Sequence, residues 1–132
     1  VKLLGISNVN LEQLSILHQN SNINPSFVQN RCFAITQWDR DIRQFCNDNS
    51  ILYQGFSLLT ANQEYLQHDS ILEIANILGK TIPQIIFRFA RDTNMIPLTG
   101  TTNLSHMTSD LNIYDFQLNE KQIQAIEQIA SI

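Results

Sequence analysis

Short apolar runs alternate with longer stretches of helical periodicity along the chain. The runs at residues 2–7, 27–33, 51–56 and 95–98 are apolar, with aromatic and branched side chains, and they predict four strands. Between them, apolar residues recur every three or four positions, which is the spacing of one helix face. The pattern predicts the order β-α-β-α-β-α-α-β-α-α.

Polar residues that favour helix starts precede the periodic stretches. The candidate caps are Asn10, Asp69, Thr81 and Asn119, while Asp39 precedes the second predicted helix and Asn103 opens a short one. Pro83 falls in the first turn after Thr81, and Gln122 follows Asn119 at the spacing of a capping box. Gly79 predicts the end of the helix that begins at Asp69, and residues 57–68 predict a polar loop.

Alternating strands and helices predict right-handed βαβ units and a parallel sheet, so the fold class is α/β. No Gly-x-Gly-x-x-Gly follows the first strand, which disfavours a Rossmann half. Polar residues end every strand: Ser7, Asn8, Gln29, Asn30, Ser57, Thr99 and Thr101. In a (β/α)8 barrel the active site lies at these strand ends. Four units make half of such a barrel, and we expect another segment or chain to cover its open edges.

The composition fits one unit spanning residues 1–132. Lys and Arg total 8 against 12 Asp and Glu, and the net charge of −4 disfavours a nucleic-acid or anionic-membrane binder. No apolar run reaches the roughly 18 residues that cross a bilayer, and residues 1–10 lack the pattern of a secretory signal. We therefore expect a cytoplasmic protein. Because the chain begins with Val1 inside a predicted strand, we also expect a piece of a longer polypeptide or a processed product.

Cysteine and histidine are sparse. Cys32 and Cys46 predict buried thiols and no disulfide framework. The histidines are scattered along the sequence and predict no metal site, with His18 and His68 expected in solvent.

Several short motifs, taken together in this order and spacing, resemble the aldo-keto reductases. They are Gly5-Ile6-Ser7-Asn8, Val28-Gln29-Asn30, Gly55-Phe56-Ser57-Leu58-Leu59, Ile96-Pro97-Leu98-Thr99-Gly100-Thr101-Thr102 with His106-Met107, and Asp115-Phe116-Gln117-Leu118. The resemblance runs nearly from end to end of the chain. It implies the C-terminal half of a (β/α)8 TIM barrel, strands five to eight, with the N-terminal half missing.

The resemblance also implies a nicotinamide cofactor, NADP or NAD. Ser7, Asn8 and Gln29 match the residues that hydrogen-bond the carboxamide, a group that both donates and accepts. Phe56 matches the aromatic residue that stacks on the nicotinamide ring. The remaining matches surround the pyrophosphate and the adenosine phosphate, and they are Ser57, Leu59, Thr99, Gly100, Thr101, Thr102 and His106.

Two departures from the family pattern matter. No Lys or Arg lies between Arg91 and Lys121, and His106 falls where Arg is common, so the choice between NADPH and NADH stays open. The family's catalytic Asp, Tyr, Lys and His lie on its first four strands, and no Tyr or Lys here matches them. Trp38 follows the second strand, where it fits a substrate-pocket wall or a packed loop anchor equally.

The resemblance implies that the intact barrel transfers hydride from NAD(P)H to an aldehyde or ketone, and that the isolated chain is inactive. Two alternatives remain: a non-catalytic regulatory or binding subunit, and a half-barrel that self-associates. The expected partners are the nicotinamide cofactor and, in the intact barrel, a carbonyl substrate. Neither nucleic acid nor a membrane is expected.

Overall fold

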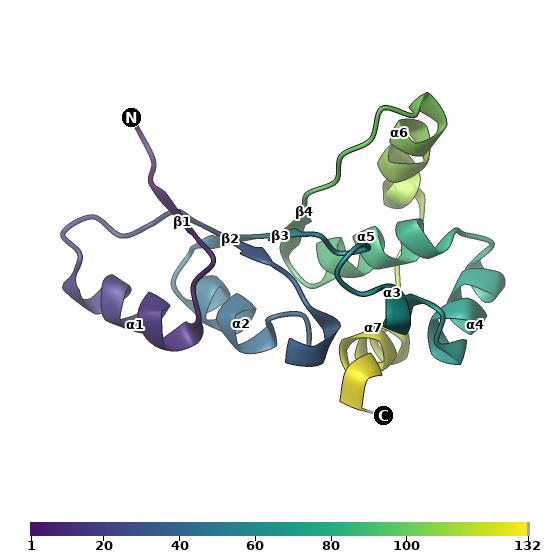
Figure 1. Cartoon of the computed structure of the whole chain (residues 1–132), viewed down its shortest axis with the longest axis horizontal. Helices are drawn as coiled ribbons and strands as arrows, with labels where there is room; N and C mark the ends of the chain where they lie inside the picture. The colour runs from purple at the N-terminus through teal and green to yellow at the C-terminus, as the bar shows by residue number, and fades with distance from the viewer. Residues whose placement is uncertain (132) are drawn as a thin grey trace.

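The computed structural model describes residues 1–131, in which four strands form one parallel sheet with helices packed against it (Figure 1). The strands lie in the order β1-β2-β3-β4, each bonded in parallel to the next. Their bounds are β1 Gly5–Ser7, β2 Phe27–Arg31, β3 Leu52–Phe56 and β4 Met95–Pro97. The predicted parallel α/β arrangement is confirmed.

Helices connect the strands in the predicted alternation. The α-helices are α1 Leu11–Asn20, α2 Arg40–Asp48, α3 Gln63–Leu66, α4 Asp69–Leu78, α5 Ile82–Asp92, α6 Leu104–Leu111 and α7 Glu120–Glu127. Short 3-10 helices are η1 Ala34–Thr36, η2 Asn112–Asp115 and η3 Ile129–Ser131. Among residues 1–131, no helix combines the length and apolarity needed to cross a membrane.

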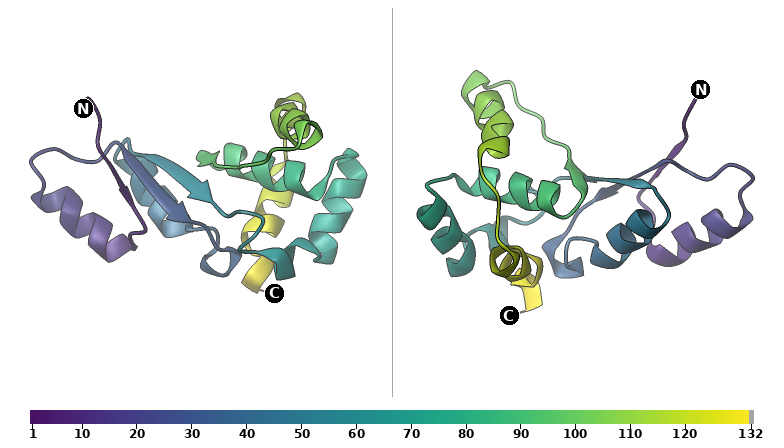
Figure 2. Two further views of the ribbon diagram at one scale, coloured as in Figure 1. Left: turned by 45° about the horizontal axis from the view of Figure 1, so that its top comes forward. Right: turned by 180° about the vertical axis from the view of Figure 1, so that it is seen from behind.

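One face of the sheet is covered and the other is bare. Val28, Tyr53 and Met95 lie in register on one face and are at most 2% exposed. Alternate residues point the other way, and there Leu52 is 50% exposed. Figures 1 and 2 show α1 and α2 on the covered side, and α6 on the opposite side beyond β4. We call the second face the uncovered face.

Trp38 is a packed anchor, which decides between its two interpretations. The side chain is fully buried, and its indole N–H donates to the Ile126 carbonyl at 2.9 Å. The ring lies 5.4 Å from that of Phe89, between their centroids. Arg43 adds a second link, because its guanidinium pairs with Glu127 and donates to the Trp38 carbonyl at 2.7 Å. The loop after β2 is thereby fastened to the last helix.

Most predicted helix boundaries are confirmed. The caps of α1, α5 and α7 each form a reciprocal box with a glutamine three residues later. Asn103 caps α6, and Gly79 ends α4 with a left-handed φ of 62°. These contacts are local in sequence, and therefore the sequence predicts them well.

One predicted cap is wrong, and one helix begins where predicted without a side-chain cap. Asp39 precedes α2 as predicted, but its side chain makes no capping contact, because Asn30 and Tyr53 donate to its carboxylate instead. For α4, the cap is His68, whose Nδ1 accepts from the backbone N–H of Ser70 at 3.2 Å. Asp69, the predicted cap, is the first helical residue.

Neither histidine expected in solvent is fully exposed. His68 is half-buried as the cap of α4. His18 is half-buried too, and its ring meets that of Phe45 edge-on at 5.5 Å. Because each ring has a specific partner in the fold, the expectation for both was wrong.

The strands are shorter than predicted because their outer residues have other partners or none. Ile51 donates its N–H to Cys46 at the end of α2, so β3 begins one residue later. Leu3 is 61% exposed at the start of the chain, outside β1. Residues 57–68 were expected to be a loop but contain α3, beside the buried side chain of Asn62. That amide donates to Cys32 and Leu58 and accepts from Ala34.

Candidate functional site

Three polar side chains form a row on the uncovered face, from the last residue of β1 to the middle residues of β2 and β3. Ser7 pairs in register with Gln29, and Gln29 with Gln54 on β3. The Gln29 Nε2 donates to the Gln54 Oε1 at 3.0 Å, which leaves the side-chain Oε1 of Gln29 and the Nε2 of Gln54 for another partner. A shallow cavity of about 340 Å³ lies over this row. Sequence reasoning missed Gln54, which strand register alone identifies.

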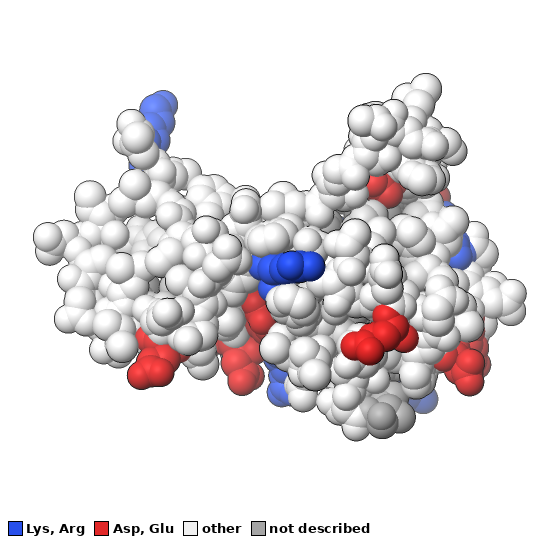
Figure 3. All heavy atoms as spheres, viewed as in Figure 1, with Lys and Arg blue, Asp and Glu red and all other residues white. Residues whose placement is uncertain are grey.

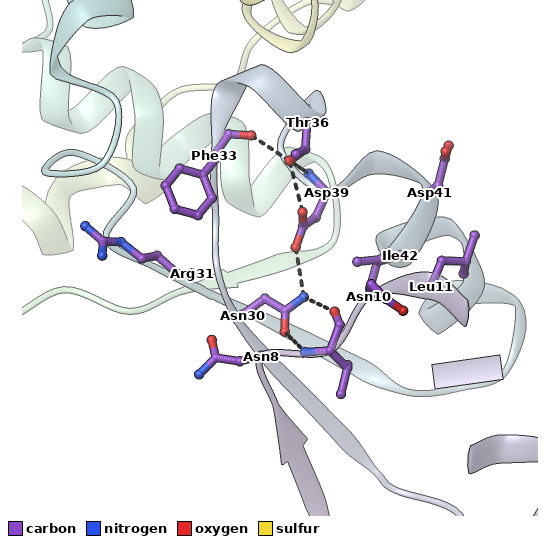
Figure 4. A pocket seen from close by; sticks show the side chains of 11 residues that line it. Asn8, Asn10, Leu11, Asn30, Arg31, Phe33, Thr36, Asp39, Asp41 and Ile42 are labelled. Carbon is purple, nitrogen blue, oxygen red and sulfur yellow. Dashed lines mark hydrogen bonds between the residues drawn. The ribbon is translucent and has the colours of Figure 1, made fainter. Parts of the chain in front are cut away.

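Asn8 is not brought into that row. Its backbone is left-handed, with φ 55°, and its N–H donates to the Gln29 carbonyl at 3.0 Å. The side chain lines a different cavity of about 440 Å³, shown in Figure 4, and there it points away from Asn30 and Asp39. The turn at Asn8 thus separates its side chain from that of Ser7.

Phe56 and the β3–α3 loop form a second recess with the end of β4. A cavity of about 380 Å³ is lined by Phe56, Ser57, Leu58, Leu59, Thr60, Phe87, Leu98, Thr99 and Gly100. Ser57 takes a left-handed φ of 56°, and Leu98 donates its N–H to the Gly55 carbonyl at 2.9 Å. The structure therefore gathers five of the predicted residues around one cavity.

The recess continues beneath α6. An adjoining cavity of about 290 Å³ shares Leu59, Phe87, Thr99 and Gly100 and adds Thr81, Pro83, Thr101, His106, Ser109 and Asp110. We call the two cavities together the α6 recess. Thr102, also predicted, is exposed and lines neither cavity.

Local hydrogen bonds hold the walls of the α6 recess in place. Asn103 Oδ1 accepts from the backbone N–H groups of Ser105, at 2.9 Å, and His106, at 3.2 Å. Thr101 Oγ1 accepts from the N–H of Asn103, and Thr99 Oγ1 donates to Asp110 Oδ2 at 3.3 Å. The loop into α6 is therefore fixed by its own polar side chains.

Among the described residues, no tyrosine or cysteine lines the α6 recess, where its side chain could act as an acid. Tyr53 is buried on the covered face, and its hydroxyl donates a hydrogen bond to Asp39. Burial raises the pKa of this hydroxyl far above its usual range. Burial raises the pKa of Cys32 to about 12 and that of Cys46 to about 11. Both cysteines are buried free thiols, as predicted. Residues 1–131 hold no cluster of three metal-ligating side chains.

Comparisons with known proteins agree on one family. The family profile described as "Aldo/keto reductase family" matches residues 1–131. A (1S)-1,7-diacetoxy-luvungin A aldo-keto reductase from Citrus sinensis is 27% identical over 97% of this chain and 42% of its own length. An NAD(P)H-dependent 6'-deoxychalcone synthase from Glycine max is 28% identical over 98% of this chain and 42% of its own length. The chain thus spans less than half of these relatives.

Solved structures show the same fold. An aldo-keto reductase from a Medee basin deep-sea metagenome library superposes with a TM-score of 0.87 at 25% identity, over 98% of this chain and 48% of its own. The Bombyx mori aldo-keto reductase in complex with NADP superposes with a TM-score of 0.85 at 24% identity, over 97% and 44%.

Proposed function

Because the chain belongs to the aldo/keto reductase family, we propose that it forms the C-terminal half of a (β/α)8 barrel and holds a nicotinamide cofactor there. The intact barrel would reduce an aldehyde or ketone by hydride transfer from NADPH or NADH. When bound, the cofactor supplies the hydride, and the residues of this chain orient its ring.

The observation that carries this proposal is the set of side chains on the uncovered face. Ser7, Gln29 and Gln54 share one row across three strands, and Phe56 lies two residues beyond Gln54 on the same side of β3. A carboxamide needs both donors and acceptors, which a hydroxyl and two amides supply. An aromatic face beside them suits a planar ring. The residues present therefore fit a nicotinamide.

The rest of the cofactor would follow the α6 recess. Ser57 and Leu59 lie between Phe56 and the end of β4, where a pyrophosphate would cross. Beyond them, the adenosine end would lie in the part of the recess beneath α6. We assign it to the predicted residues Thr99, Gly100, Thr101 and His106, with Thr102 at the exposed edge. Asn8 is assigned only a backbone role, because its turn positions Ser7.

The uncovered face needs further strands to become a barrel interior. Leu52 is 50% exposed on it, and β1 and β4 each have an unpaired edge. We propose that a preceding segment or a second chain supplies four more strands. The relatives support this, because the chain spans 42% of the Citrus sinensis enzyme.

Proton transfer to the substrate would come from that other half. The hydroxyl of Tyr53 is buried on the covered face, and Tyr114 is 64% exposed on η2, away from the row of Ser7 and Gln29. The Lys80 ammonium pairs with Asp115 at 2.8 Å. Among the described residues, no Tyr, Lys, His, Asp or Glu lines the cavities beside Ser7, Gln29 and Phe56, and we therefore expect no carbonyl reduction by this chain alone.

The test is whether the purified chain binds the cofactor. Binding is measured by calorimetry and by the fluorescence of the reduced nicotinamide. Gln29→Leu should weaken binding about fivefold to tenfold, because one hydrogen bond to the carboxamide is lost. Gln67→Leu, an exposed glutamine outside the site, is the matched control. The proposal fails if neither NADH nor NADPH binds, or if the two variants behave alike. Carbonyl reduction by the chain alone would refute the assignment of proton transfer to another half.

A further inference from the structure

A carboxylate stands on the wall of the α6 recess, and the function proposed above does not use it. Asp110 lies in the last turn of α6, half-buried, and lines the cavity together with Thr99 and Thr101. The Thr99 hydroxyl donates to its Oδ2 at 3.3 Å. This contact ties the carboxylate to the loop that leaves β4.

Lysine and arginine are absent from the described residues that line the same recess. Lys80 precedes the lining residue Thr81, but its ammonium lies 2.8 Å and 2.9 Å from the two carboxylate oxygens of Asp115. In Figure 3, α6 and the loop that leads to it show no blue spheres.

The helix end offers little to an added phosphate either. A phosphate at a helix N-terminus binds free backbone N–H groups. At α6, Asn103 Oδ1 already accepts from two of them, those of Ser105 and His106. An anion that bound the N–H groups of Ser105 and His106 would have to displace the Asn103 side chain.

We infer that the α6 recess selects an adenosine whose ribose hydroxyls are free, so that the chain binds NAD(H) in preference to NADP(H), with Asp110 as the specificity-determining residue. The inference rests on the proposed function, which places the adenosine end of the cofactor here. A carboxylate accepts charge-assisted hydrogen bonds from ribose hydroxyls. It repels a 2′-phosphate of like charge, and no Lys or Arg among the described residues that line the recess compensates.

The experiment isolates the adenosine end of the cofactor. ADP-ribose and 2′-phospho-ADP-ribose are titrated into the full chain by calorimetry, in the same buffer for both ligands. We expect ADP-ribose to bind at least about tenfold more tightly. Asp110→Asn should bring the two dissociation constants within about threefold of each other, mainly by strengthening the phosphorylated ligand. Glu12→Gln makes the same charge change on α1, at the opposite end of the molecule (Figure 1), and should leave the ratio unchanged.

The outcomes separate this inference from the function on which it rests. Equal or tighter binding of 2′-phospho-ADP-ribose by the wild-type chain overturns the inference and leaves the proposed function standing. If neither ligand binds, the proposed function falls and the inference with it. Should Asp110→Asn not fold, salt provides the second test, because screening weakens the repulsion. Between about 0.05 and 0.5 M salt the preference for ADP-ribose should shrink, and a constant ratio would overturn the inference.

Discussion

The Tyr53 hydroxyl, on the covered face of β3, donates a 2.7 Å hydrogen bond to the carboxylate of Asp39, the residue that precedes α2. The same carboxylate accepts from Asn30 at 2.9 Å and from Thr36 at 3.0 Å. Asn30 in turn bonds both the N–H and the carbonyl of Val9 (Figure 4). One acidic side chain therefore joins two strands, the loop after β1 and the start of α2.

Replacing this carboxylate should weaken the fold. Asp39→Asn keeps the side-chain shape and tolerates the left-handed φ of 55°. Its NH2 group, however, must replace either Oδ2, which accepts from Tyr53 and Asn30, or Oδ1, which accepts from Thr36. Because a partly buried donor loses its acceptor, we expect a loss of about 2 kcal/mol in the free energy of unfolding. Urea unfolding measures this loss. Asp48→Asn, at the exposed end of α2, should stay within about 0.5 kcal/mol of the wild type.

Gly55 is required by the packing between β3 and β4. A Cβ at this position would overlap the sulfur of the fully buried Met95 and lie 3.4 Å from the Cβ of Cys32. Gly55→Ala should therefore cost about 1–3 kcal/mol, as overpacking does in close-packed cores. Gly100→Ala has no atom within 4 Å of its new Cβ and provides the control in thermal unfolding. Equal melting temperatures for the two variants would contradict this account.

Stability should fall in alkaline solution. The pKa of Cys32 is raised by burial from 9.0 to about 12 and that of Cys46 to about 11, while the Tyr53 hydroxyl shifts in the same direction. Above pH 9 the unfolded chain releases thiol protons that the folded chain keeps, so rising pH favours unfolding. Each thiol should lower the free energy of unfolding by about 1.4 kcal/mol per pH unit, until its folded-state pKa is reached.

Urea titrations at pH 8 and pH 10.5 measure this slope. The double variant Cys32→Ala, Cys46→Ala loses both thiols and should show a smaller decrease between the two pH values. Its lower stability at pH 8 does not enter the comparison, because each protein serves as its own reference. An unchanged slope would show that the thiols do not cause the alkaline loss.

Phe56 should contribute to cofactor affinity by stacking its aromatic ring on the nicotinamide. Phe56→Ala should weaken binding of NADH about threefold to tenfold, the loss of one stacking contact. Phe56→Tyr keeps an aromatic face and should bind within about twofold of the wild type. Phe33→Ala, a 37% exposed aromatic side chain at a different cavity, is the control. Weak binding by Phe56→Tyr would show that shape and not stacking is the requirement.

Local sequence patterns predicted the features that local contacts determine. The capping pairs of Asn10 with Gln13, Thr81 with Gln84 and Asn119 with Gln122 lie three residues apart, so the sequence displays both partners. At Asp39 the sequence predicts the start of α2 but not the contacts of the side chain, because its partners Tyr53 and Asn30 are distant in sequence.

The candidate site likewise contains residues that the sequence indicates and residues that only the fold reveals. Strand-end polarity indicated Ser7 and Gln29, and the sheet places them side by side. Gln54 and Asp110 were missed because neither belongs to a motif. Strand register places Gln54 beside Gln29. The packing of α6 over the end of β4 places Asp110 on the wall of the α6 recess, and this packing depends on the whole fold.

The hydrogen bond from the Trp38 indole to the Ile126 carbonyl spans 88 positions of sequence. A growing chain can pair β1, β2 and β3 as each leaves the ribosome, because every strand contacts only the next one. The indole, however, stays without its acceptor until residue 126 emerges. This part of the interior is therefore closed only after residue 126 has been synthesised, 88 positions after Trp38, and a nascent chain that stalls before α7 exposes it to proteases and chaperones.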